Sequence, residues 1–117
     1  MLFRSLEKEG DVAAVIAETV RSTPLIPPAD YWRRIRDACD RHGALLILDE
    51  IPNCLGRTGK MFVCEHYDIV PDMVVLGKGL GGGIFPLAAL VVREGLDRKS
   101  TRLNSSHSQQ SRMPSSA

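Results

Sequence analysis

One stretch decides the fold: residues Met73 to Phe85 read M-V-V-L-G-K-G-L-G-G-G-I-F. The apolar run Met73–Leu76 is typical of a buried strand, and it leads into Lys78, which has a glycine on each side. Glycine allows positive φ angles and lets a ligand approach the backbone closely. The sequence therefore predicts a strand that presents a lysine at its own end, beside space for a ligand.

Three more apolar runs predict further strands around this one. Val12–Val20 is apolar without alternation, as expected for a central parallel strand covered on both faces, and Ala44–Leu48 is similar. Leu87–Val92 follows a glycine-rich connection too short for a crossover helix, so we expect it to run antiparallel to its neighbour. The predicted fold is α/β, with a mostly parallel sheet and one antiparallel strand.

The connections are predicted to be helical in places. Trp32, Ile35 and Cys39 recur at helical spacing, with Asp30 as a candidate N-cap and Gly43 as the C-cap, which predicts a helix over 31–42. Residues 2–9 are expected to form the end of another helix, and 61–67 a short turn or helix. The prolines within 21–29 indicate a loop.

Three ionisable residues follow the first three strands: Glu18, Asp49 and Lys78. Ligands of parallel α/β sheets bind at the carboxyl ends of the strands, so we expect these side chains on one edge. Lysine forms Schiff bases with carbonyls, and an apolar, glycine-lined pocket would lower its pKa toward the neutral nucleophile. A nearby carboxylate can keep a pyridine nitrogen protonated, which makes the ring an electron sink.

Two phosphate-binding motifs are present only in part. Gly77, Gly79 and Gly82 spell G-x-G-x-x-G, but the dinucleotide fingerprint requires a helix next, whereas the following residues predict a strand. The stretch 56–60, G-R-T-G-K, lacks the first glycine of a phosphate loop and is followed by Met61 instead of Ser or Thr. We reject both readings.

Composition narrows the class of protein. The chain has 117 residues and a net charge of +1, which argues against a nucleic-acid surface because phosphate binding needs clustered basic residues. Its three cysteines include no C-x-x-C pair, so we expect reduced thiols in a cytoplasmic protein and no metal site. No apolar run approaches the roughly 20 residues of a membrane span.

The last 21 residues differ from the rest. Residues 97–117 contain seven serines and almost no bulky apolar side chain. Two blocks, D-R-K-S-T-R-L-N-S-S-H and S-R-M-P-S-S-A, resemble the translation of a sequencing adapter, with 108–110 at its variable index. We therefore expect 97–117 to be a non-native, disordered tail, with a disordered native terminus as the alternative.

Three segments carry a resemblance to a known family: A-A-V-I-A-E-T-V, L-L-I-L-D-E-I-P-N-C-L-G-R-T-G-K-M-F and P-D-M-V-V-L-G-K-G-L-G-G-G. Together they resemble class III aminotransferases, pyridoxal-phosphate (PLP) enzymes of fold type I, over residues 1–96. The resemblance implies that Lys78 forms the Schiff base with the cofactor and that Asp49 bonds the pyridine nitrogen. It also implies that Ile51 packs on one ring face and that Glu18 lies on the substrate side.

The sequence departs from the family at two of these positions. The family commonly has proline at position 19 and a ring-contacting glutamine at position 52, where this chain has Thr19 and Pro52. Proline cannot supply that hydrogen bond, so the resemblance does not extend to the ring contact at position 52. The sequence gives Asn53 and Cys54 no role beyond the loop.

The resemblance also implies a larger protein. The family's phosphate-binding loop, stacking aromatic, partner-subunit threonine and small domain have no counterpart here, so we expect 1–96 to be part of a large domain. We expect the parent to be a homodimer, and the fragment itself to be inactive and poorly soluble.

The implied activity is amino-group transfer between an amine or ω-amino acid and a keto acid. Two alternatives stay open. The first is a PLP-dependent lyase or aminomutase, because Lys78 and Asp49 would serve those reactions too. The second, less favoured, is a non-catalytic α/β nucleotide-binding module that uses the glycine run as a phosphate cradle.

Overall fold

The computed structural model describes residues 2–23 and 25–96; the predicted tail, 97–117, lies outside the described residues. The elements follow in the order α1 (Leu2–Glu9), β1 (Ala14–Glu18), α2 (Tyr31–His42), β2 (Leu45–Asp49), η1 (Val63–Tyr67), β3 (Met73–Leu76), η2 (Lys78–Gly81) and β4 (Ala89–Val92), where η marks a short 3-10 helix. The α/β class predicted from the sequence is confirmed.

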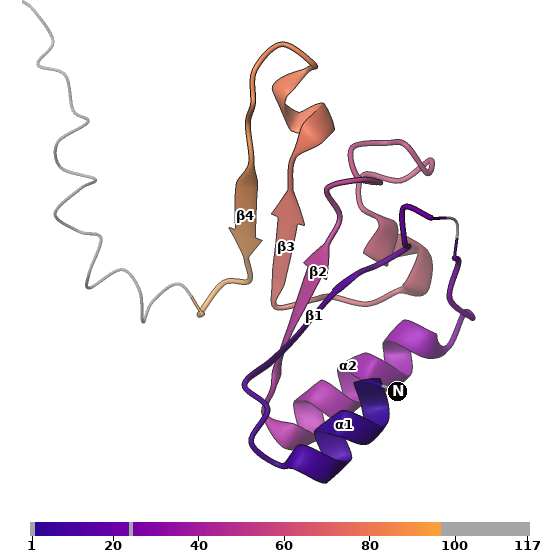
Figure 1. Cartoon of the computed structure of the whole chain (residues 1–117), viewed down its shortest axis with the longest axis vertical. Helices are drawn as coiled ribbons and strands as arrows, with labels where there is room; N and C mark the ends of the chain where they lie inside the picture. Colours follow the sequence, from indigo (N-terminus) through magenta and orange to yellow (C-terminus); the bar gives the residue numbers. More distant parts are fainter. Residues whose placement is uncertain (1, 24, 97–117) are drawn as a thin grey trace, which may run out of the picture.

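The four strands form one sheet in the order β1-β2-β3-β4. β1, β2 and β3 are parallel, and β4 runs antiparallel to β3, as expected from the short glycine-rich connection. Figure 1 shows β3 and β4 side by side, joined by a connection that extends away from the helices. The carboxyl ends of the three parallel strands therefore meet at one edge, because they point the same way.

The helices α1 and α2 pack together, and α2 packs against β2 on one face of the sheet (Figure 1). On that face Val15, Leu46 and Leu48 are buried, and from α2 the side chains of Trp32 and Ile35 pack into the same core. Apolar residues at helical spacing on α2 thus meet alternate residues of the strands.

The opposite face of the sheet is open in the described part of the chain. Ile16 of β1 is 64% exposed and Leu90 of β4 is 57% exposed. The expectation of a central strand covered on both faces is therefore wrong for β1, which lies at the edge of this sheet with one face uncovered. The continuous apolar run of β1 is nevertheless typical of a strand that has a layer of protein on each face.

The caps of α2 differ in how well they were predicted. Gly43 is the C-cap, as predicted, with a φ of 67°; a backbone N–H of this cap donates to the Cys39 carbonyl. Asp30 precedes the helix without a side-chain capping bond; its carboxylate lies 3.8 Å from the guanidinium of Arg34 instead. Among the described residues no helix is long and apolar enough to cross a membrane.

Candidate active site

Lys78 stands where the sequence predicts it, two residues beyond β3 and at the start of η2. Its φ of 47° lies in the left-handed region, which a side chain with a Cβ rarely adopts. The residue is exposed at a pocket of about 330 Å³ whose lining includes Ile51, Phe85 and Leu87. The amine is therefore accessible, and a strained backbone conformation sets where it leaves the chain.

Ile51 packs closely against the end of β3. A Cβ added to Gly77 would lie 3.3 Å from the Ile51 Cγ2 atom, which is tighter than most real contacts. Glycine at position 77 thus lets Ile51 lie beside the backbone that leads to Lys78. The two residues that the resemblance assigns to the cofactor, the lysine and the aliphatic side chain, line the same pocket.

Asp49 is the last residue of β2, and its register partner in β3 is Val75. The carboxylate is half-buried, and its Oδ1 accepts a hydrogen bond of 3.0 Å from the backbone N–H of Ile51. This bond closes a local turn and thereby orients the Asp49 carboxylate at the edge of the sheet. No hydrogen bond or ion pair joins Asp49 to Lys78 in the described part of the chain.

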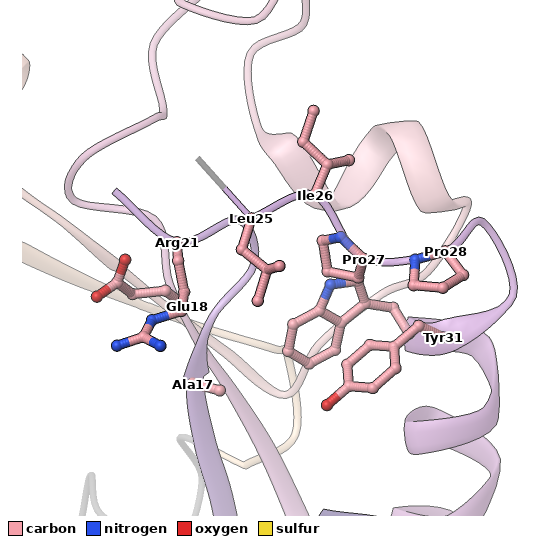
Figure 2. Close-up of a pocket in the computed structure, with 9 residues that line it drawn as sticks. Ala17, Glu18, Arg21, Leu25, Ile26, Pro27, Pro28 and Tyr31 are labelled. Carbon is pink, nitrogen blue, oxygen red and sulfur yellow. The ribbon is translucent and has the colours of Figure 1, made fainter. Parts of the chain in front are cut away.

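Glu18 ends β1 and is the register partner of Asp49, so the three predicted residues do share one edge of the sheet. Its Oε2 accepts a hydrogen bond of 2.8 Å from the N–H of Ser22. The side chain lines a second pocket, of about 380 Å³. Figure 2 shows the charged side chains of Glu18 and Arg21 at one end of this pocket and the Tyr31 ring at the other.

The structure thus brings Lys78 and Ile51 into one pocket, with Asp49 bonded to the Ile51 backbone, and places Glu18 at another pocket. The mostly apolar pocket at Glu18 has the larger volume, but we place the candidate site at Lys78, because a nucleophilic amine is the group that defines the chemistry. The glycine run leads into η2 and then β4, without the α-helix that a dinucleotide site needs.

Sequence reasoning missed Glu50. This side chain is fully buried, and its carboxylate accepts hydrogen bonds from the Thr19 hydroxyl and the backbone N–H groups of Val63 and Cys64. The available signal was alternation: a strand that buries Leu48 places Glu50 on the same inward face. A carboxylate there requires partners.

Two loop residues with no predicted role also take part. The Asn53 Nδ2 donates a hydrogen bond of 2.7 Å to the Val20 carbonyl, which ties the loop after β2 to the residues after β1. Cys54 is buried. The loop is thus part of the packed structure.

Burial, and to a smaller extent the neighbouring Glu50 carboxylate, raises the pKa of the Cys64 thiol in η1 to about 12.

The three cysteines are unpaired and buried. Within residues 2–23 and 25–96 no group of three or more His, Cys, Asp and Glu side chains could hold a metal ion.

Comparisons with known proteins agree on one family. Residues 2–108 match the family described as Aminotransferase class-III. A (R)-1-hydroxy-2-aminoethylphosphonate ammonia-lyase of Vibrio splendidus is 48% identical over 90 residues, covering 76% of this chain and 19% of the relative. An uncharacterised aminotransferase of Archaeoglobus fulgidus is 51% identical over 92 residues, covering 76% of this chain and 22% of the relative.

The solved structures show the same fold. A transaminase from the marine bacterium Virgibacillus superposes with a TM-score of 0.81 at 38% identity, over 86% of this chain and 24% of that one. The described sheet, mostly parallel with one antiparallel pair, is thus part of the fold of such enzymes. The chain spans about a fifth of the length of the two curated relatives.

Proposed function

The chain belongs to the class III aminotransferases, and from this premise we propose that it is part of a longer PLP-dependent enzyme. That enzyme transfers an amino group between an amine or ω-amino acid and a keto acid. The single observation that carries the proposal is the position of Lys78, accessible beside Ile51 at the edge of the sheet where Asp49 also lies.

The residues present fit the cofactor. A pyridine aldehyde needs a covalent, an apolar and a charged partner. The accessible Lys78 amine and the Ile51 side chain in the same pocket can supply the first two, and the Asp49 carboxylate, bonded to the Ile51 N–H, can supply the third. Gly77 supports this fit, because its missing Cβ is what lets Ile51 approach. When bound, PLP supplies an aromatic ring that withdraws electrons from the substrate carbon.

The protein's own residues then have separate tasks. Lys78 would hold the cofactor through its Nζ atom, and the same amine would afterwards carry a proton. Asp49 would keep the pyridine nitrogen protonated, and the bond from the Ile51 N–H to its Oδ1 holds the carboxylate in place. Ile51 would pack on the ring and exclude water from one face. Glu18 would lie on the substrate side, and its side chain lines the pocket of Figure 2.

The wider setting is part of the proposal. The parent is a homodimer in the cytoplasm that uses small amines and keto acids, and residues 1–96 alone are inactive. Exposed apolar side chains at Ile84, Phe85 and Leu87 support burial against further protein.

Residues 97–117 are a non-native tail. Sequencing the encoding DNA tests this proposal, because bases that differ from the adapter sequence across 97–107 would refute it. The native reading frame that contains residues 1–96 would then encode the longer protein.

Replacing Lys78 tests the function in that longer protein. Unaltered protein should show the yellow colour of lysine-bound cofactor, and borohydride reduction should fix the cofactor on the peptide that contains Lys78. Lys78→Ala should lose both the colour and the turnover of amine with keto acid. A colourless parent, or a Lys78→Ala variant that keeps the colour, would overturn the proposal.

A lyase reaction on the same residues is the second candidate, because the Vibrio splendidus relative is named an ammonia-lyase. The two activities differ in their co-substrate. A transferase needs a keto acid for each amine consumed and releases no ammonia, whereas an ammonia-lyase releases ammonia without a keto acid. Ammonia release from amine alone would favour the lyase.

A further inference from the structure

Glu50 follows Asp49 directly and has no exposed surface. Its Oε1 accepts hydrogen bonds from the Thr19 hydroxyl at 3.0 Å and the Cys64 N–H at 2.7 Å, and its Oε2 accepts one from the Val63 N–H at 2.7 Å. No cation is bonded to this carboxylate in the described part of the chain. Three neutral donors, from the end of β1 and from η1, converge on it instead.

The backbone of Glu50 is used as fully as its side chain. Its N–H donates to the Val75 carbonyl of β3 at 3.1 Å, and its carbonyl accepts from the N–H groups of Asn53 at 3.0 Å and Cys54 at 2.9 Å. One residue therefore joins the ends of all three parallel strands, the turn after β2 and η1.

The strands on either side of Glu50 carry predicted site residues close to these bonds. Thr19, which donates to the carboxylate, is the residue after Glu18. Val75, which accepts from the Glu50 N–H, is three residues before Lys78. A shift of Glu50 would thus move the outer strand ends relative to the middle one.

The turn after β2 depends on Glu50 in the same way. Asn53 and Cys54 close this turn by bonding to the Glu50 carbonyl, and Ile51 lies within it. The Ile51 N–H in turn donates to the Asp49 carboxylate. The direction of Asp49 and the position of Ile51 are therefore both set by the conformation around Glu50.

We propose that Glu50 is a positioning residue that holds Asp49 and Ile51 in register with Lys78 at the cofactor. The proposal rests on the proposed PLP function. Glu50 touches neither substrate nor cofactor; it acts through the two residues on either side of it and through the strand ends that it joins. The Thr19 hydroxyl is one of its anchors, which a proline at that position could not supply.

The test compares Glu50→Gln with Asp72→Asn in the longer protein. Glutamine keeps the volume of Glu50 but turns an amide NH₂ toward one of the donors, so the residue must shift. Asp72 is a matched control, because it too is a buried carboxylate, bonded to the Leu46 N–H at 2.8 Å and to Arg36 at 2.7 Å, but it precedes β3 at the far end of the sheet.

Three readouts separate positioning from stability: the dissociation constant of PLP from the apoprotein, the visible spectrum of the bound cofactor, and kcat/KM per bound cofactor. Glu50→Gln should weaken PLP binding, shift the spectrum and lower kcat/KM roughly 10- to 100-fold, as a displaced reacting group does. Asp72→Asn should lower the melting temperature and leave the spectrum and kcat/KM unchanged.

Thr19 provides a milder pair of variants should Glu50→Gln fail to fold. Thr19→Ser keeps the hydroxyl that bonds Glu50, so it should bind PLP like the unaltered protein. Thr19→Val has nearly the same shape without the hydroxyl, and it should weaken PLP binding and shift the spectrum in the same direction as Glu50→Gln, by less.

Each result has one meaning. If Glu50→Gln and Thr19→Val lower only the melting temperature, as Asp72→Asn does, the positioning role is overturned while the PLP function stands. If the unaltered protein binds no PLP, the proposed function fails and this inference fails with it.

Discussion

Two buried carboxylates hold opposite ends of the sheet, and they do so with different partners. Glu50, at the carboxyl end of β2, is bonded by a hydroxyl and two backbone N–H groups. Asp72, just before β3, is bonded by the Leu46 N–H and by the guanidinium groups of Arg36 and Arg93, at 2.7 and 2.9 Å. Among the described residues, arginines neutralise the carboxylate only at the Asp72 end.

The difference shows how the two ends are specialised. Burial raises the pKa of the Asp72 carboxyl, but the Leu46 N–H and the Arg36 guanidinium outweigh burial and hold the pKa below its ordinary value. The arginines thus fasten the end remote from Lys78. At the end near Lys78, fixed neutral dipoles orient the Glu50 carboxylate, and no arginine is bonded to it within the residues that the structure describes.

Replacing each carboxylate by alanine should give the largest changes in the free energy of unfolding and the clearest difference between the two ends of the sheet. Asp72→Ala leaves the largely buried Arg36 without its closest partner and should lower the free energy of unfolding by about 3 to 5 kcal/mol. Glu50→Ala leaves two backbone N–H groups unpaired and should cost less, about 2 to 3 kcal/mol. Urea unfolding followed by fluorescence of Trp32, the single tryptophan, measures both. A larger loss for Glu50→Ala would contradict the contrast.

Alkaline pH should weaken the Glu50 end through the Cys64 thiol. The folded-state pKa of Cys64 is raised to about 12, above its value in the unfolded chain, so the contribution of this thiol to stability is fully present below about pH 9 and is lost as pH rises from there toward 12. The loss has an upper limit of about 4 kcal/mol. Cys64→Ala is the control.

Urea titrations at a series of pH values should therefore give a shallower alkaline decline for Cys64→Ala than for the unaltered chain. Equal slopes for the two proteins would show that the Cys64 thiol does not report on this end of the sheet.

Backbone strain gives a smaller difference at the same end. Because Lys78 has a left-handed φ of 47°, Lys78→Gly should be more stable than Lys78→Ala by about 1 kcal/mol. The pair has a second use, since both variants lack the amine and differ only in backbone freedom. Urea midpoints that coincide for the two variants would show that the position is unstrained.

The smallest expected effect belongs to the partly exposed partner of Asp72. The Arg93 side chain is 52% exposed, so Arg93→Gln should lower the free energy of unfolding by less than about 1 kcal/mol. Arg36→Gln, with its side chain 13% exposed, is the matched comparison and should cost clearly more. Equal losses would mean that burial does not decide the worth of these ion pairs.

Local patterns in the sequence predicted most of the elements. The bounds of β3 and α2 are those expected from the apolar run 73–76 and the helical spacing in 31–42, and the antiparallel β4 followed from the length of its connection. These features depend on residues close together in the chain, which is why the sequence alone was enough.

The sequence could not predict what depends on distant residues. The bond between Thr19 and Glu50 joins positions 31 residues apart, and the edge position of β1 depends on what else covers the sheet. Glu18, Asp49 and Lys78 were correctly expected at one edge, but their division between two pockets follows from side-chain packing. Their roles in catalysis stay predictions.

The left-handed conformation of Lys78 has a consequence for engineering this chain. A redesign that selects each residue for thermal stability alone would choose glycine at position 78, because glycine adopts that conformation without a steric penalty. The stabilised protein would keep its sheet and lose the Lys78 amine, the one nucleophile among the described residues that line the pocket. A lysine conserved at this position among homologous sequences would therefore indicate selection for its amine, against the conformational preference of the backbone for glycine.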